Sequence, residues 1–93
     1  MKKVLVVGFT PYELERNLEE KYPNVLWFFA SNIRNIDSPQ GISESVKIMD
    51  EILFYDGYIN NRIGWEVACV MCSKDISSIT DYPVDGVNKG EEE

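Results

Sequence analysis

No histidine occurs in this chain, so the commonest general base and the commonest metal ligand are both missing. Any catalysis must use carboxylates, tyrosines or cysteines. Two acids draw attention, because Asp56 and Glu66 lie among apolar residues in the segment YDGYINNRIGWEVACVM. A partly desolvated carboxylate can act as a nucleophile or as a general acid or base. Each also has a structural explanation, because Asp56 and Gly57 form a common turn pair and the start of a helix favours the charge of Glu66.

The two cysteines, Cys69 and Cys72, form a CxxC pair. A zinc site would need about two further nitrogen or sulfur ligands, which this chain lacks unless a second copy supplies them. A redox pair normally lies at the start of a helix, whereas this pair falls inside a helical pattern. We therefore expect two small, partly buried thiols, and we expect neither a metal nor a cofactor.

Four apolar runs predict β-strands, because they are short and are bounded by glycine, proline or polar residues. The segments are KKVLVVGF, NVLWFFA, ILFYDG and ISSIT. The segments between them have helical periodicity or helix-capping signals. The predicted helices begin near Thr10, Ser43 and Arg62. The intervening segment 31–41 is polar and contains Pro39 and Gly41, so it is predicted to be a loop.

Two details of these helices are predicted from local patterns. The first helix is expected to begin with a capping box, in which Thr10 is the N-cap, Pro11 is the first helical residue and Glu13 is the third. In the third helix, the apolar face predicted to point to the core carries four residues. They are Ile63, Val67, Val70 and Met71.

The alternating order β-α-β-α-β-α-β with short connections predicts a parallel sheet with right-handed crossovers and helices on both faces. The fold class is α/β, as a small three-layer, doubly wound domain with four strands in the order 2-1-3-4, similar to flavodoxin-like and Rossmann-like folds. Residues 1–80 are expected to form this single domain. Residues 81–93 are expected to form an acidic, flexible C-terminal tail.

In such a sheet the strand-to-helix loops emerge at the carboxyl edge, and ligands bind there, where the strand order reverses. Besides Asp56 and Glu66 as candidate catalytic residues, the loops bring candidate substrate-binding residues to this edge. They are Gly8, Thr10, Tyr12, Arg34, Asn60, Asn61 and Arg62. Gly8 permits a close approach of ligand to backbone, and the N–H groups of the following helix suit an anion. Arg34 and Arg62 are candidate phosphate ligands or solvated loop cations.

Segment 50–75 resembles the nucleoside 2-deoxyribosyltransferase-like family of small α/β enzymes. Members have an apolar strand ending in Asp-Gly, a short loop with Asp or Asn, a glycine, and a glutamate followed by small residues. The corresponding elements here are EILFYDG, YINN, Gly64, Glu66, Ala68 and Cys69. The resemblance implies that Glu66 attacks the anomeric carbon of a nucleoside or nucleotide, and that Asp56 and Asn60 line the site. A carboxylate suits this reaction because the glycosyl transition state is positively charged.

Composition restricts the partners. The formal net charge of the 93-residue chain is −7, and the segment DYPVDGVNKGEEE supplies −4 of it. So few Lys and Arg residues make duplex nucleic acid a poor partner. No apolar run approaches the roughly 20 residues that span a bilayer, so we expect no membrane partner and a cytoplasmic location. We also expect a homodimer, formed through the helix face that carries Trp65 and Cys69.

Two functions from different classes remain open. The first is a nucleoside deoxyribosyltransferase or nucleotide N-glycosidase, and the hydrolase is favoured if Arg34 or Arg62 binds a 5′-phosphate. The second is a non-catalytic interaction or regulatory domain that binds a protein through its acidic face or tail. A response-regulator receiver is disfavoured, because the first strand ends in Gly-Phe-Thr without an acidic cluster for Mg²⁺.

Overall fold

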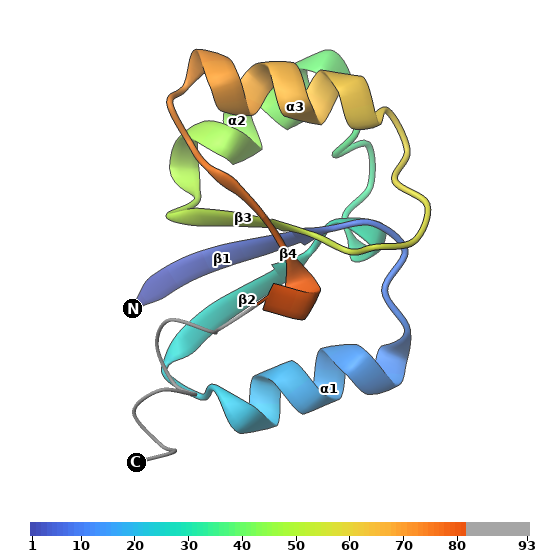
Figure 1. The fold of residues 1–93 in the computed structure, drawn as a ribbon, viewed down its shortest axis with the longest axis vertical. Coiled ribbons are helices and arrows are strands. Elements are labelled where there is room, and N and C mark those ends of the chain that lie inside the picture. Colours follow the sequence, from blue (N-terminus) through green and yellow to red (C-terminus); the bar gives the residue numbers. More distant parts are fainter. Residues whose placement is uncertain (82–93) are drawn as a thin grey trace.

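The computed structural model describes residues 1–81 of the chain. Within them, four strands alternate with three α-helices and two short 3-10 helices (Figure 1). The strands are β1 (Lys2–Val7), β2 (Val25–Phe29), β3 (Glu51–Phe54) and β4 (Ile76–Ser78). The helices are α1 (Tyr12–Lys21), η1 (Ala30–Asn32), α2 (Pro39–Ile48), α3 (Arg62–Met71) and η2 (Ile79–Asp81). The expected tail falls almost entirely on residues 82–93, which lie outside the described residues.

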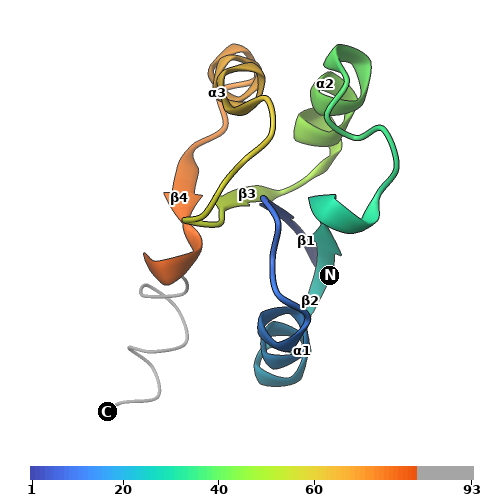
Figure 2. The same cartoon turned by 90° about the vertical axis from the view of Figure 1, so that its right-hand side faces the viewer.

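The four strands form one sheet with the order β2-β1-β3-β4, and all neighbouring strands are parallel. The α/β prediction and its 2-1-3-4 strand order are therefore confirmed. Figure 2 shows α1 on one face of the sheet and α2 and α3 side by side on the other. This is the three-layer arrangement of a small Rossmann-like or flavodoxin-like domain.

Each face of the sheet has its own core, because successive side chains of a strand point to opposite faces. In β1, Leu5 and Val7 pack under α2 and α3, together with Ile52 of β3. The alternate residues Val4 and Val6 pack toward α1. All five of these side chains are buried, so β1 and β3 are covered on both sides, as expected for the central strands of a parallel sheet.

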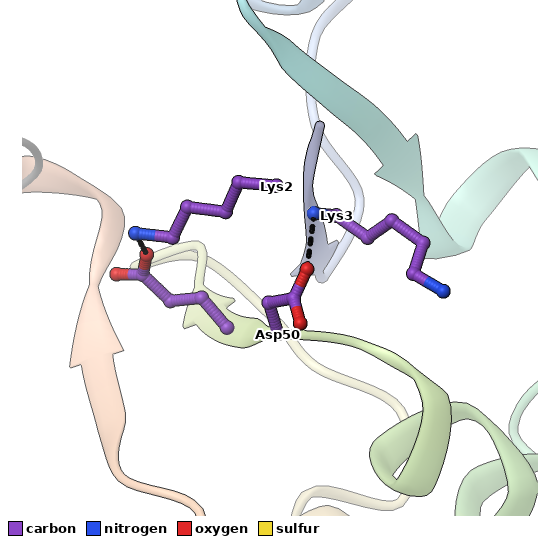
Figure 3. A network of polar contacts seen from close by, with 4 residues as sticks. Lys2, Lys3 and Asp50 are labelled. Atoms are coloured by element: carbon purple, nitrogen blue, oxygen red, sulfur yellow. Dashed lines mark hydrogen bonds and ion pairs between the residues drawn. The ribbon is translucent and has the colours of Figure 1, made fainter.

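Polar contacts join β1 and β3 at the amino edge of the sheet (Figure 3). The backbone N–H of Lys3 donates to Asp50 Oδ2 at 2.7 Å, and the Asp50 N–H donates back to the Lys3 carbonyl at 2.8 Å. Beside them, Lys2 Nζ lies 2.6 Å from Glu51 Oε1. The Lys74 ammonium donates to the carbonyls of Val46 and Met49, at the end of α2. The amino edge is thus closed by contacts between neighbouring elements.

The predicted starts of the first two helices are wrong. The first helix begins at Tyr12 with Pro11 as N-cap, and Thr10 makes no cap, because its hydroxyl donates to Glu15 Oε2 at 2.6 Å instead. The second helix begins at Pro39 and not near Ser43, because Ser38 accepts a hydrogen bond from the Gly41 N–H and Pro39 is the first helical residue.

The predicted orientation of the third helix is also wrong. Trp65 and Cys69, which were expected to face outward, are 1% and 0% exposed, and they pack in the core between α3 and the sheet. The four residues expected to face inward point to solvent. Their exposed fractions are 73% for Ile63, 50% for Val67, 76% for Val70 and 80% for Met71. The face proposed for dimerisation is therefore the buried face of α3.

Within the described residues, no helix combines the length and apolar character that crossing a membrane requires.

Candidate functional site

A pocket of about 150 Å³ opens at the carboxyl edge of the sheet, where the strand order reverses. Its walls come from the loop after β1, the segment after β2 and the loop after β3, with one residue of α3. The lining residues are Val7, Gly8, Phe9, Ala30, Ser31, Ile33, Ile36, Asp37, Asn60 and Trp65. Most of these are apolar, and Asp37, Asn60 and Ser31 supply side-chain polar groups, which is the usual composition of a small-ligand site.

Gly8 makes this pocket possible, because the chain turns sharply at the end of β1. Its φ of +131° is a conformation that residues with a side chain rarely adopt. A Cβ at this position would lie 2.8 Å from the Cβ of Tyr55, in the loop after β3. The two loops can therefore approach each other only because residue 8 is glycine.

Asp37 joins the loops that follow β2 and β3. Its Oδ2 accepts a hydrogen bond from the side-chain amide of Asn60, and its carbonyl accepts one from Asn61 Nδ2 at 3.3 Å. Asn61 has a left-handed backbone, with φ of 55°, which asparagine tolerates better than most residues. These bonds fix the Asp37 carboxylate at the pocket wall.

Two aromatic rings stand beside the pocket. Phe9 and Tyr58 are stacked, with ring centroids 5.8 Å apart and planes inclined by 7°. They are 57% and 69% exposed, so this aromatic pair is open to solvent. The Tyr58 hydroxyl lies 3.4 Å from Asn60 Oδ1, as a hydrogen-bond donor. A planar ligand at the mouth of the pocket would meet an aromatic surface here.

The two candidate catalytic acids have other partners. Glu66 Oε2 accepts from Arg62 Nε at 3.2 Å, and the Arg62 guanidinium lies 5.1 Å from the centre of the Phe54 ring. Asp56 Oδ1 accepts from the Ser78 hydroxyl at 2.6 Å, which connects the end of β3 to β4. Neither acid lines the pocket. Successive side chains of α3 point in directions about 100° apart around the helix axis. Trp65 therefore reaches the pocket, whereas its neighbour Glu66 points elsewhere.

Of the remaining candidate binding residues, some lie at the pocket and others have partners away from it. Gly8 and Asn60 line the pocket, and Asn61 supports it through Asp37. Thr10 is engaged by the buried Glu15. Tyr12 is exposed on α1 beneath the Arg16 guanidinium, which lies 6.0 Å from its ring centre.

Arg34 lies exposed in the segment after β2, between the pocket residues Ile33 and Ile36. Its guanidinium has no hydrogen bond or ion pair with another described side chain. It remains a candidate phosphate ligand beside the pocket.

Cys69 lies on the inner face of α3, and Cys72 is the C-cap residue of that helix. Cys69 is buried and Cys72 is partly exposed, and both are free thiols. Burial raises the pKa of the Cys69 thiol, the neighbouring Cys72 adds to this, and Lys74 opposes it. Reactive cysteines usually have a lowered pKa, whereas the pKa of Cys69 is raised. No group of three or more potential ligands that could hold a metal ion occurs within residues 1–81.

Asp37 lies in the loop predicted for segment 31–41, but it was not among the predicted site residues, and neither were Phe9, Tyr58 and Trp65. A signal was present for the two exposed rings, because each directly follows a glycine in the loop after a strand, Gly8 after β1 and Gly57 after β3. An aromatic residue at such a position is carried out of the sheet and not into the core. No local signal indicated that Asp37 would meet Asn60, since the two residues are 23 positions apart.

No protein-family model, curated protein or solved structure matches this chain significantly.

Proposed function

We propose that this domain binds a nucleoside or nucleotide at the pocket on the carboxyl edge and acts on its N-glycosidic bond. The observation that supports this most is the combination of a fixed carboxylate, Asp37, in an apolar pocket with an exposed aromatic pair at its mouth. A carboxylate stabilises the positive charge of a glycosyl transition state, and aromatic rings bind the flat base.

The size of the pocket sets how such a ligand binds. Its volume of about 150 Å³ is below the roughly 300 Å³ at which drug-sized ligands are usually enclosed. One half of a nucleoside therefore enters, and the other half lies across the mouth. The sugar belongs inside, next to Asp37, and the base lies on Phe9 or Tyr58. Arg34, exposed near the opening, is available to a 5′-phosphate.

Two carboxylates are candidates for the chemical step. Asp37 lines the pocket, whereas Glu66 is the nucleophile that the family resemblance implies. In either case the bond from C1′ to the base nitrogen breaks, and its electron pair leaves with the base, which takes a proton from solvent. A carboxylate oxygen bonds to C1′, and water or a second base then displaces it.

Binding is tested first, by titrating the chain with deoxynucleosides and their 5′-monophosphates and following heat or NMR shifts. Saturable shifts at Phe9, Asp37 and Asn60 are expected. Asp37→Asn should weaken binding or turnover, and Asp75→Asn provides a control with the same loss of charge between α3 and β4. The absence of saturable binding by every nucleoside and nucleotide tested would overturn the proposal.

Turnover is measured separately, as release of free base. Loss of release in Asp37→Asn but not in Glu66→Gln would assign the reaction to the pocket carboxylate, and the reverse would assign it to Glu66. Glu44→Gln, on exposed α2 surface, is the matched control for the glutamate. Binding without release from any compound would leave a non-catalytic nucleotide-binding domain and refute the enzyme.

A further inference from the structure

Helix α1 contains a buried carboxylate that the proposed chemistry does not use. Within residues 1–81, Glu15 is the single charged residue that is buried, at 9% exposure. Burial of a charge is unfavourable unless hydrogen bonds replace the lost water. The helix dipole favours an acid in this first turn, but Glu13 occupies the same turn and is exposed. The dipole therefore does not explain why Glu15 is buried.

Two hydrogen bonds account for the position of Glu15. The Thr10 hydroxyl donates to Oε2 at 2.6 Å, and the Asn32 side-chain amide donates to Oε1 at 3.3 Å. The two donors come from separate segments, because Thr10 lies in the loop after β1 and Asn32 ends η1, after β2. Helical side chains lean toward the start of their helix, which brings the carboxylate back toward this loop. One buried carboxylate thus joins the segments that follow β1 and β2.

These two segments form two of the three walls of the carboxyl-edge pocket. Phe9 and Ser31 line it, and each directly precedes a residue that donates to Glu15. Glu15 itself does not line the pocket, because it belongs to α1, on the opposite face of the sheet from α2 and α3 (Figure 2). Asp37 and Asn60 join the segment after β2 to the loop after β3. All three walls are therefore connected, through one carboxylate behind the pocket and one on its wall.

We propose that Glu15 is a positioning residue, which holds η1 and the loop that carries Phe9 in the arrangement that accepts a ligand. Its importance for binding rests on the proposed function, whereas its hold on the two walls does not. Without the carboxylate, Thr10 and Asn32 lose their shared acceptor, and the two segments move independently. A ligand then binds only those molecules in which the walls are in place, so the apparent affinity falls by that fraction.

The first measurement uses the free chain. Glu15→Met keeps the length of the side chain but removes both carboxylate oxygens. In the natural chain, the stacked rings of Phe9 and Tyr58 should shift each other's NMR signals and show proton–proton contacts. These shifts and contacts should weaken in Glu15→Met. Glu13→Met makes the same substitution on the exposed side of the same turn and should leave them unchanged. Identical Phe9 signals in Glu15→Met and the natural chain would overturn the proposal.

An exchange of partners tests the contact itself. Asn32→Asp places a second carboxylate beside Glu15 Oε1, and because like charges repel, the two walls should separate. Adding Glu15→Gln restores one amide and one carboxylate in reversed places, while the amide oxygen still accepts from Thr10. The Phe9 and Tyr58 signals should then return toward those of the natural chain. A double variant no closer to the natural chain than Asn32→Asp would refute the contact, and this pair decides the question if Glu15→Met does not fold.

The second measurement is the affinity for the 2′-deoxynucleoside 5′-monophosphates, followed by calorimetry. The dissociation constant should rise by about threefold to tenfold in Glu15→Met, because fewer molecules have both walls in place, and it should change little in Glu13→Met. Urea denaturation separates this loss from unfolding, since a chain that stays about nine-tenths folded loses only about a tenth of its apparent affinity.

The two measurements distinguish the two proposals. Equal affinities for Glu15→Met and the natural chain would overturn the positioning role. If no nucleotide binds the natural chain while the Phe9 signals still change in Glu15→Met, the proposed function fails and the hold of Glu15 on the pocket walls stands.

Discussion

The two edges of the sheet are held together in different ways. At the amino edge, short connections and direct contacts close the structure: Lys3 with Asp50, Lys2 with Glu51, and Lys74 with the end of α2. At the carboxyl edge, longer loops meet around a pocket and are joined through Asp37, Asn60 and the Phe9–Tyr58 rings. The contacts at the amino edge stabilise the fold, whereas the loops at the carboxyl edge form a candidate binding site. Such a division is common, because binding residues often lie on loops that a rigid scaffold holds in place.

The largest expected effect lies at the carboxyl edge, with Gly8→Ala. The substituted residue would need a φ of +131° and would place its Cβ 2.8 Å from that of Tyr55. Backbone strain and overpacking each cost about 1–3 kcal/mol, so we expect a loss of about 2–4 kcal/mol in the free energy of unfolding. Urea denaturation measures it.

Gly57→Ala is the matched control for Gly8→Ala. Its Cβ would meet ring atoms of Tyr55, at 2.8 Å, but Gly57 is exposed and has no positive φ. The neighbouring ring can move, so the loss should be smaller than for Gly8. Equal losses would show that residue 8 has no special backbone requirement.

The next largest loss of stability is expected for Lys74→Met, at the amino edge. The methionine keeps the length of the side chain but removes the ammonium that the Val46 and Met49 carbonyls accept from. A charged hydrogen bond is worth about 1.5–3 kcal/mol when buried, and partial exposure lowers this to about 1–2 kcal/mol here. Thermal or urea unfolding of Lys74→Met beside Lys47→Met, an exposed lysine of α2, measures the difference. Equal losses of unfolding free energy in both variants would show that the hydrogen bonds of Lys74 add no stability to this edge.

The fold was predictable because its signals are local and repeated. Four short apolar runs separated by helical segments admit few arrangements, and right-handed crossovers leave the observed order as the natural one. The orientation of α3 was not predictable in the same way. Ile63, Val67 and Val70 form one apolar face, and Trp65, Ala68 and Cys69 form another, so periodicity alone cannot choose between them. Packing of the large Trp65 ring beneath α3 decides it.

The candidate site was predictable in location but not in detail. The reversal of strand order placed a pocket at the carboxyl edge, and Gly8 and Asn60 line it. Which carboxylate reaches the pocket depends on the path of the long segment after β2. Its path is set by the left-handed Asn35 and by Gly41, where a Cβ would lie 2.6 Å from the Asn35 carbonyl oxygen. Such contacts between distant backbone atoms leave no periodic pattern in the sequence.

A pH dependence of stability is expected from the interior of the molecule, where Cys69 is buried. The pKa of Cys69 is raised above its ordinary value of 9.0, mainly by burial. Below pH 9 the thiol is protonated in both the folded and the unfolded chain, so its contribution to the free energy of unfolding does not change with pH. Above pH 9 the unfolded chain releases a proton that the folded chain keeps, so stability falls, by at most about 1.4 kcal/mol per pH unit.

Urea unfolding at pH 8, 9 and 10 measures this slope. Cys69→Ala should be less stable at pH 8 because a buried side chain is shortened, but it should lose less stability on going to pH 10. Cys72→Ala keeps the buried thiol and should retain most of the slope. Parallel pH profiles for the natural chain and Cys69→Ala would contradict the assignment.

The smallest expected effect belongs to Lys2→Met at the amino edge. Although Lys2 Nζ lies 2.6 Å from Glu51 Oε1, the lysine side chain is half exposed. Exposed ion pairs contribute about 0–1 kcal/mol, and salt screens them, so the loss should be below about 1 kcal/mol and should shrink further in 1 M NaCl. The amino edge would then owe its stability to backbone contacts and to Lys74. A loss from Lys2→Met larger than that from Lys74→Met would reverse this order and make the surface pair the principal contact of the edge.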